Sequence, residues 1–172
     1  MIDLGAFVRD VPDFPRPGIL FKDITPLLGD PRAFAQSIET LAAPFRGRVD
    51  RVACIDARGF LFGAPAAIAL GVGLVPIRKP SKLPYKTHSV GYALEYGTNT
   101  LSMHTDAVTP GERVLLIDDV LATGGSAGAA ISLLEAGGAR LVGAAFLIEL
   151  AFLGGRAKLA PGLDVVAAIT YA

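Results

Sequence analysis

The sequence predicts an α/β fold, a mostly parallel and twisted β-sheet flanked by helices, and two observations support this prediction. From residue 51 onward, short strand-like segments alternate with helical segments, which is typical of a parallel sheet. The strand-like segments, such as VLLID at 114–118, are nearly continuous in Val, Ile and Leu, as expected for strands covered on both faces. A length of 172 residues suits one domain, so we expect residues 1–172 to share a single core.

The first expected elements are a hood and a helix. Residues 1–29 are rich in Pro, Gly and Asp and lack a long periodic pattern, so we expect a small irregular N-terminal hood. A helix should follow, because Asp30 suits the N-cap, Pro31 the first turn and Gly47 the end. Its apolar residues share one face at helical spacing: Phe34, Ile38, Leu41, Ala42 and Phe45.

Strands and helices then alternate along the chain. The expected strands are 51–56, 74–79, 113–118 and 140–150, and the expected helices are 59–71 and 126–138. The longest apolar stretch, 63–77, is shorter than the roughly 18–20 residues that a membrane-spanning helix needs. The chain starts without the pattern of an export signal, and the single cysteine, Cys54, cannot form an internal disulfide, so we expect a cytoplasmic protein.

Residues 91–104 depart from this pattern because polar and apolar residues alternate there, as in a β-hairpin. A basic, proline-interrupted loop, IRKPSKLPYKTHS, precedes them. A hairpin inserted into a parallel α/β domain often serves as a mobile lid, so we expect residues 79–104 to form a flexible loop and lid. The alternation places Tyr92, Leu94 and Tyr96 on one side, Ala93 and Glu95 on the other, and Gly97, Thr98 and Asn99 in the turn.

The segment after the strand at 113–118 predicts an anion site. Glycines let backbone N–H groups turn inward, the start of the next helix adds unpaired donors, and two hydroxyls can donate as well. The residues of this anion loop are Ala122, Thr123, Gly124, Gly125 and Ser126. The loop lacks the lysine of a Walker motif and the G-x-G-x-x-G pattern of dinucleotide-binding proteins, so we expect it to bind one phosphate monoester.

Two adjacent carboxylates, Asp118 and Asp119, stand just before this loop. As acceptors they suit the 2′ and 3′ hydroxyls of a ribose whose 5′-phosphate lies in the loop, or a hydrated Mg²⁺ shared with that sugar. Taken alone, the pair would also fit a satisfied turn or a metal and phosphoacceptor pair. The spacing to the anion loop favours a ribose phosphate.

The segment VLLIDDVLATGGS resembles the 5-phosphoribosyl-1-pyrophosphate (PRPP) motif of the type I phosphoribosyltransferase family. Five further segments are similar to the adenine enzymes of this family, in order and over nearly the whole chain: FPRPGILFKDITPLL, DARGFLFG, IRKPSKLP, LEYGTNTLSMH and GRAKLAP. The resemblance implies the type I fold with its hood and lid, a homodimer, and the purine-salvage conversion of adenine and PRPP to AMP and pyrophosphate with Mg²⁺. The metal is expected to bind through PRPP, pyrophosphate and water rather than through dedicated side chains.

The resemblance also implies roles around PRPP. Asp118 and Asp119 would hold the ribose hydroxyls, and the anion loop would hold the 5′-phosphate. Arg58 would receive pyrophosphate, for which a guanidinium fork is suited, although a surface salt bridge is the alternative interpretation. Arg78, Lys79 and Lys82 would add cationic charge, partly to the site of the neighbouring subunit, or would form a solvated basic loop.

The remaining implied roles concern adenine and the lid. Glu95 would act as the acid or base that handles the purine proton, which is worth about 10²–10⁴-fold in rate, and Tyr96 would shape the closed lid. The main chain of Leu20 and Lys22 would read the edge of adenine, Phe21 would stack on it, and Val120 and Leu150 would contact its other side. A plain exposed carboxylate is the alternative for Glu95, and core packing is the alternative for Phe21 and Val120.

Two other functions are compatible with the fold. One is a phosphoribosyltransferase for a 6-oxopurine, which a main-chain reading of the base edge would discriminate against. The other is a PRPP-sensing regulator without catalysis that binds nucleic acid. Sixteen basic and sixteen acidic residues leave no net charge, which argues against nucleic acid as a partner.

Overall fold

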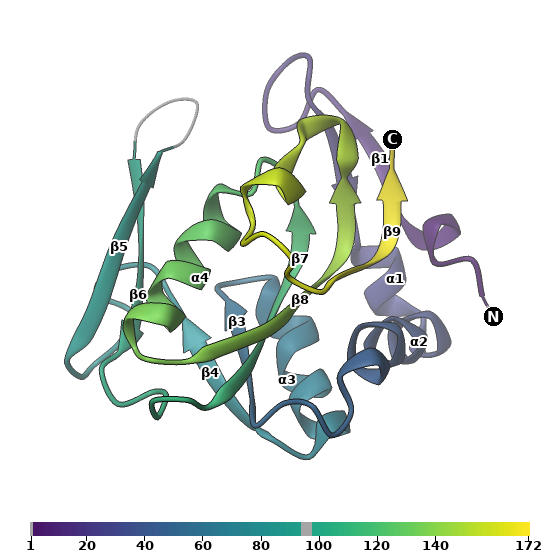
Figure 1. Ribbon diagram of the computed structural model, residues 1–172. Helices are drawn as coiled ribbons and strands as arrows, with labels where there is room; N and C mark the ends of the chain where they lie inside the picture. Colours follow the sequence, from purple (N-terminus) through teal and green to yellow (C-terminus); the bar gives the residue numbers. More distant parts are fainter. Residues whose placement is uncertain (1, 94–97) are drawn as a thin grey trace.

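The computed structural model, which describes residues 2–93 and 98–172, is built on a five-stranded sheet (Figure 1). All neighbouring strands are parallel, and their order across the sheet is β4-β3-β7-β8-β9. The prediction of a mostly parallel α/β fold is confirmed. The strands are β3 (Arg51–Ile55), β4 (Gly73–Ile77), β7 (Arg113–Leu121), β8 (Arg140–Leu150) and β9 (Val165–Tyr171).

Helices cover both faces of the sheet. α2 (Pro31–Ala42) and α3 (Gly59–Leu70) pack on one face, and α4 (Gly125–Ala136) packs on the other (Figure 1). Successive residues of β7 alternate between the two cores: Leu115 and Ile117 face α2 and α3, whereas Leu116 faces α4. Because both faces are buried, every position from Val114 to Ile117 is apolar, and this explains the continuous run in the sequence.

The first long helix, α2, begins as predicted. The Asp30 carboxylate accepts hydrogen bonds from the N–H groups of Arg32 and Ala33, both at 2.9 Å. The helix ends at Ala42, and the chain continues as a 3₁₀ turn, η2 (Ala43–Phe45), before Gly47 turns it with a φ of 70°. Four residues of the predicted apolar face are fully buried, namely Ile38, Leu41, Ala42 and Phe45, and Phe34 packs against them.

The N-terminal hood is more regular than predicted. It contains a 3₁₀ turn, η1 (Leu4–Phe7), a short helix, α1 (Thr25–Gly29), and an antiparallel pair of strands, β1 (Arg9–Pro12) and β2 (Leu20–Asp23). Each strand has four residues, β1 mostly exposed and β2 mostly half-buried, and neither has a fully buried position. Neither therefore gives the alternating apolar pattern by which a strand with one buried face is predicted. The expectation of an irregular hood is therefore wrong for this pair.

The predicted hairpin is present, but its bounds differ. β5 (Thr87–Ala93) pairs antiparallel with β6 (Thr98–His104), starting four residues earlier than expected. Thr98 and Asn99 pair with Ala93 and Tyr92 and so belong to β6 rather than to the turn, because strand pairing overrides their turn propensity. The predicted positions of Leu94, Glu95, Tyr96 and Gly97 lie outside the described residues.

The predicted elements end at residue 150, whereas the chain goes on to complete the sheet. Two 3₁₀ turns, η3 (Ala151–Leu153) and η4 (Gly155–Lys158), lead into β9, which pairs with the end of β8. The sequence VVAAITY carries the β-branched residues of a strand, so this element could have been predicted. In the part of the chain that the structure describes, no helix is long and apolar enough to cross a membrane.

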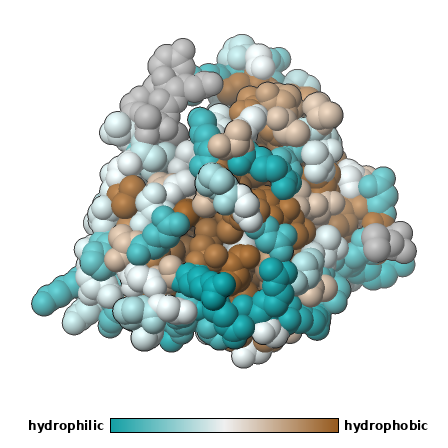
Figure 2. Space-filling model, in the orientation of Figure 1, coloured by the Kyte–Doolittle hydropathy of each residue, from teal (hydrophilic) through white to brown (hydrophobic). Residues whose placement is uncertain are grey.

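One group of exposed apolar side chains lies at one end of the molecule. Figure 2 shows apolar surface near the top of the face in view, where Figure 1 places the hood and the end of β8. The large apolar residues exposed in the hood and in η3, the turn after β8, are Phe14, Ile19, Leu20, Phe152 and Leu153. This end of the sheet is also the carboxyl end of its strands.

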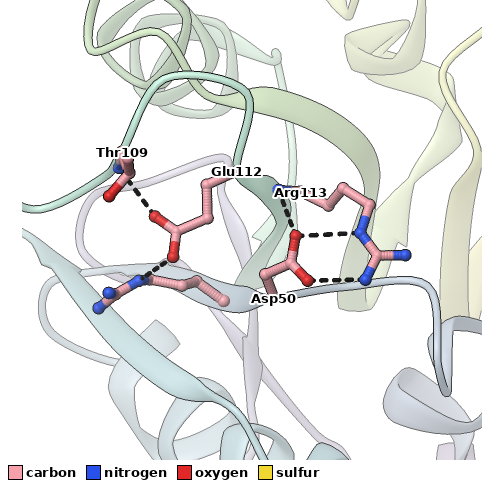
Figure 3. A network of polar contacts seen from close by, with 5 residues as sticks. Asp50, Thr109, Glu112 and Arg113 are labelled. Atoms are coloured by element: carbon pink, nitrogen blue, oxygen red, sulfur yellow. Dashed lines mark hydrogen bonds and ion pairs between the residues drawn. The ribbon is translucent and has the colours of Figure 1, made fainter.

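Ion pairs secure the opposite, amino end of β3 and β7 (Figure 3). Asp50 accepts from the N–H, the Nε and the Nη2 of Arg113 at 2.9, 3.0 and 2.6 Å. Glu112 accepts from the Nε of Arg51 at 2.6 Å and from the N–H of Thr109 at 2.8 Å. The two strands are thus joined by charged hydrogen bonds where they begin.

Candidate active site

A cavity lies where the order of the strands reverses. After β3 the chain adds β4 on one side and then crosses back to place β7 on the other, and ligands of open α/β sheets bind at the carboxyl ends of such strands. The cavity has a volume of about 430 Å³. Its lining consists of Ile55, Asp56, Ala57, Arg58, Lys79, Tyr92, Leu101, Asp118, Asp119, Val120, Ala122 and Ser126.

The structure therefore brings together residues that are far apart in the sequence. The predicted site residues among the lining are Arg58, Lys79, Asp118, Asp119, Val120, Ala122 and Ser126. They come from the ends of β3, β4 and β7 and from the start of α4. The carboxyl ends of neighbouring parallel strands meet at one edge, so the fold concentrates this chemistry in one place.

The anion loop connects β7 directly to α4. Its residues border a small hollow of about 60 Å³ beside the main cavity. Gly124 is the N-cap of α4 and has a φ of 80°, a left-handed conformation that favours glycine. Because glycine has no side chain, the N-cap makes no side-chain hydrogen bond to the first N–H groups of α4. These groups and the partial positive charge of the helix start suit an anion.

The acidic pair is buried beside this loop. Asp118 and Asp119 are 8% and 6% exposed, and the Oδ1 of Asp118 accepts the N–H of Asp119 at 2.9 Å. The Nε of Arg58 lies 2.7 Å from the Oδ2 of Asp119, but the two are not aligned as a hydrogen bond. Among the described residues, this Oδ2 is the one buried side-chain nitrogen or oxygen that lacks a hydrogen-bond donor.

The electrostatics of the pair follow from its burial. Loss of solvation, followed by repulsion from Asp119, raises the pKa of Asp118 well above its usual value. Loss of solvation also raises the pKa of Asp119, while Arg58 acts in the opposite direction. A ligand that donates hydrogen bonds or brings a cation would stabilise the ionised form of both groups.

The segment after β3 closes the other side of the cavity. The peptide bond between Asp56 and Ala57 is cis, and Arg58 follows it directly. A Cβ atom at Gly59 would lie 2.6 Å from the Oδ1 of Asp118, so only glycine lets α3 start this close to the acidic pair. The Nε of Arg78 donates to the Oδ2 of Asp56 at 2.8 Å, which ties the end of β4 to this segment.

Some predicted residues lie near the cavity without lining it. The Arg78 side chain is engaged with Asp56, and its Nη1 donates to the carbonyl oxygen of Lys82 at 3.2 Å. The Lys82 side chain is exposed, and Leu150, like Val120, is partly buried at the edge of the core around α2 and α3. Arg78, Lys82 and Leu150 are thus outside the cavity lining.

The hood reaches the site through Phe21. The Arg58 guanidinium carbon lies 5.2 Å from the centre of the Phe21 ring, which also meets Phe14 edge-to-face at 5.0 Å. The Nζ of Lys22 instead pairs with Asp10 at 2.6 Å and lies 3.9 Å from the centre of the Tyr171 ring. Leu20, Phe21 and Lys22 are outside the cavity lining, and the Lys22 side chain is engaged elsewhere.

Three residues that line the cavity, Asp56, Tyr92 and Leu101, were not predicted from the sequence as site residues. Asp56 is the carboxylate that holds Arg78, and its place at a strand end next to Arg58 was an available signal. Leu101 is a buried residue of β6, and the Oγ of Ser126 lies 3.4 Å from the Oη of Tyr92 on β5. Glu95 and Tyr96 lie outside the described residues, so their roles stay predictions.

Comparison with known proteins gives a consistent result. Residues 28–161 match the family model described as the phosphoribosyl transferase domain. The adenine phosphoribosyltransferase of Maridesulfovibrio salexigens is 53% identical over 169 residues, which are 98% of this chain and 99% of the relative.

Solved structures agree with the sequence comparison. The crystal structure of adenine phosphoribosyltransferase from Thermoanaerobacter pseudethanolicus has a TM-score of 0.94 and 51% identity, and the match covers 98% of each chain. The enzyme from Saccharomyces cerevisiae, complexed with an imino-altritol bisphosphate and adenine, has a TM-score of 0.88 and 40% identity over 94% of each chain. The likeness spans the hood, the sheet and the C-terminal strand.

Proposed function

The chain belongs to the phosphoribosyl transferase family, and we propose that it is a purine-salvage enzyme that converts adenine and PRPP to AMP and pyrophosphate. One observation carries this proposal: a phosphate-sized anion loop and a buried pair of carboxylates border the same cavity. A ribose 5-phosphate presents an anion at one end and vicinal hydroxyls at the other, so it matches both features at once.

The ribose of PRPP would lie over the acidic pair. Its hydroxyls would donate to Asp118 and Asp119, and one of them would supply the donor that the Oδ2 of Asp119 lacks. Its 5′-phosphate would accept hydrogen bonds from the anion loop, with Thr123 and Ser126 adding their hydroxyls to the backbone donors. The two negative charges therefore serve the sugar and do not oppose the phosphate.

The pyrophosphate group would lie between the ends of β3 and β4. Arg58 and Lys79 line the cavity there, and Arg78 and Lys82 lie on either side of Lys79 in the chain. Their positive charges would stabilise the charge that develops as the bond from ribose C1 to pyrophosphate breaks. Because Arg58 also faces Asp119, it would link the leaving group to the sugar site.

The site fits Mg²⁺ that is bound mainly through the substrate. The orphaned Oδ2 of Asp119 and the buried Asp118 are oxygen ligands of the kind Mg²⁺ prefers, directly or through water. When bound, the ion would neutralise charge on pyrophosphate. Asp118 and Asp119 would then keep their ionised forms, against the rise in pKa that burial causes.

Adenine would lie between the hood and the end of β7. The hood's β2 pairs with β1 on one side, and within the described residues this small sheet has no third strand. Main-chain groups of Leu20 and Lys22 along its outer edge can therefore read the amino edge of the base. Phe21, next to Arg58, would stack on the base, and Val120 with Leu150 would contact its other side.

Glu95 on the lid would handle the proton that the purine loses when its nitrogen bonds to ribose C1. The decisive experiment measures AMP formation from adenine and PRPP by the unaltered protein and by the Glu95→Gln variant. We expect kcat of the variant to fall by about 10²–10⁴-fold while the KM for PRPP changes little. Glu135→Gln on the exposed side of α4 is the control, and faster turnover of guanine than of adenine would contradict the choice of base.

We also infer a homodimer and a cytoplasmic location. Two apolar residues of α3, Leu61 and Ile68, are 42% and 82% exposed, and Leu74 on β4, a strand that α3 contacts, is exposed as well. A second subunit that covers them would bring its own basic loop near the site. Light scattering measures the mass of the unaltered protein and of Ile68→Glu. We expect a dimer for the unaltered protein and a monomer for the variant.

The cytoplasmic location is supported by Cys54, which is buried and unpaired and therefore fits a reducing compartment.

A further inference from the structure

The turn η4 lies directly behind the anion loop. A Cβ atom at Gly155 would lie 2.1 Å from the carbonyl oxygen of Ala122 and 2.9 Å from the amide nitrogen of Gly124. A Cβ atom at Gly124 would in turn lie 2.5 Å from the carbonyl oxygen of Gly155. Main chain meets main chain at this contact, and neither side has room for a side chain.

Arg156 fastens this turn to the sheet. Its Nε donates to the Oε1 of Glu149 at 2.9 Å, its Nη2 donates to the Oε2, and its Nη1 donates to the carbonyl oxygen of Val165 at 3.0 Å. Glu149 belongs to β8 and is buried, and the hydrogen bonds from Arg156 lower its pKa. The fork of the guanidinium thus holds η4 to the end of β8 and the start of β9.

We propose that Gly155 and Arg156 are positioning residues that hold the anion loop in the shape that binds the 5′-phosphate, an inference that rests on the proposed function. Gly155 contacts the backbone of the loop, and Arg156 keeps Gly155 against it. A cradle of N–H groups binds an anion tightly when the groups converge before the anion arrives, because ordering them on binding would reduce the affinity. This gives a role to the GRAKLAP segment, to which the family resemblance assigned none.

The test compares two ligands that differ by the 5′-phosphate, AMP and adenosine. Their dissociation constants are measured by calorimetry on the full-length protein. Gly155→Ala should weaken AMP binding by about 10- to 100-fold, since a shift of the loop by about 1 Å is costly, and should leave adenosine binding unchanged. Gly128→Ala is the matched control, because its Cβ would lie 3.8 Å from the carbonyl oxygen of Lys158 in the same turn.

Arg156 gives a second and milder test that does not depend on how Gly155→Ala folds. Arg156→Ala should also reduce AMP affinity selectively, and Arg156→Lys should recover part of it, because an ammonium cannot make the paired hydrogen bonds to Glu149. An unchanged ratio of AMP to adenosine affinity in Gly155→Ala and Arg156→Ala overturns the inference, as does an equal loss for both ligands. A failure of the proposed function is distinct, since the unaltered protein would then bind AMP no more tightly than adenosine.

Discussion

β3 and β7 have acidic residues at both ends, and the two ends differ in how those residues are satisfied. At the amino end, Asp50 receives three hydrogen bonds from Arg113, which lower its pKa to about 2, and Glu112 is paired with Arg51 (Figure 3). At the carboxyl end, Asp118 and Asp119 are more deeply buried, have Arg58 as their shared cation, and have raised pKa values.

This difference distinguishes carboxylates that are hydrogen-bonded within the protein from a carboxylate that can still accept a hydrogen bond from a ligand. A carboxylate that already accepts hydrogen bonds from the protein has few lone pairs left for a ligand. The Oδ2 of Asp119, in contrast, accepts no hydrogen bond and belongs to a residue that lines the cavity. Natural sequences tolerate such local conflicts mainly where function requires them. The contrast between the two ends therefore points to the carboxyl end of the strands as the candidate site.

The largest expected effect comes from removing the charges of the acidic pair. In the double variant Asp118→Asn/Asp119→Asn, we expect kcat/KM for PRPP to fall by about 100-fold or more, because two charged acceptors of the ribose hydroxyls are lost. Asp50→Asn at the other end is the control and should keep the activity of the unaltered protein. Initial rates of all three proteins are measured at varied PRPP concentrations. Equal activity of the unaltered protein, the double variant and Asp50→Asn would mean that the carboxyl end is not the site.

A smaller effect is expected from crowding the acidic pair without changing its charge. Gly59→Ala would place a Cβ atom 2.6 Å from the Oδ1 of Asp118, so the carboxylate must move. We expect the KM for PRPP to rise by about 10-fold, since misplaced groups lose much of their binding energy. Gly128→Ala is the control, because it adds a Cβ atom without crowding. If steady-state kinetics give the same KM for PRPP in both variants, the close contact at Gly59 is not important for function.

Removing one neutral hydroxyl should have a still smaller effect. Tyr92→Phe deletes the Oη that lies 3.4 Å from the Oγ of Ser126 and lines the cavity. We expect about a threefold rise in the KM for PRPP, the size of one modest neutral hydrogen bond. Tyr171→Phe, which keeps its ring beside Lys22, should show no change in the same assay. A loss of kcat alone in Tyr92→Phe would point instead to lid movement.

The smallest expected effect, a shift in melting temperature, has opposite signs at the two ends. A carboxyl group with a raised pKa destabilises the folded state above its ordinary pKa of about 4, so Asp118→Asn should raise the melting temperature at pH 7 but not below pH 4. Asp50 has a lowered pKa and stabilises the fold above pH 4, a contribution that is lost as the pH falls toward 2. Asp50→Asn should therefore lower the melting temperature at pH 7, with the difference disappearing near pH 2.

Calorimetric scans of these single variants at pH 7 and at low pH check both signs. The control is the unaltered protein in the same buffers. A lower melting temperature for Asp118→Asn at pH 7 would show that the buried carboxylate is satisfied within the protein, which contradicts the contrast between the two ends.

Much of the fold could be predicted from local signals. Asp30 and Pro31 mark the start of α2 because an N-cap and a first-turn proline act within a few residues. Thr98 and Asn99 were misplaced in a turn because their partners across the hairpin, Ala93 and Tyr92, are not adjacent in the sequence. The β1–β2 pair was not predicted for a related reason, since its two short strands have no fully buried face.

The candidate site likewise has a part that could be predicted from the sequence and a part that could not. Asp118, Asp119 and the anion loop are contiguous, so their chemistry and spacing are visible in the chain itself. Asp56 and Tyr92 join them only when the fold brings the end of β3 and the β5–β6 hairpin to the cavity at the end of β7. The brace formed by Gly155 and Arg156 depends on a contact between backbones, and no pattern of residue types encodes such a contact.

The sequence by itself determined a parallel α/β fold and a phosphate cradle beside two acids, because periodicity, capping and loop chemistry act over neighbouring residues. Only the tertiary structure decided which charges are satisfied, since that depends on donors brought in from distant segments. Arg113 reaches Asp50 and fills its acceptors, whereas Arg58 reaches Asp119 without aligning with it. Hydrogen bonds from Arg113 lower the pKa of Asp50, whereas loss of solvation raises the pKa of Asp119, whose Oδ2 has no donor from the protein.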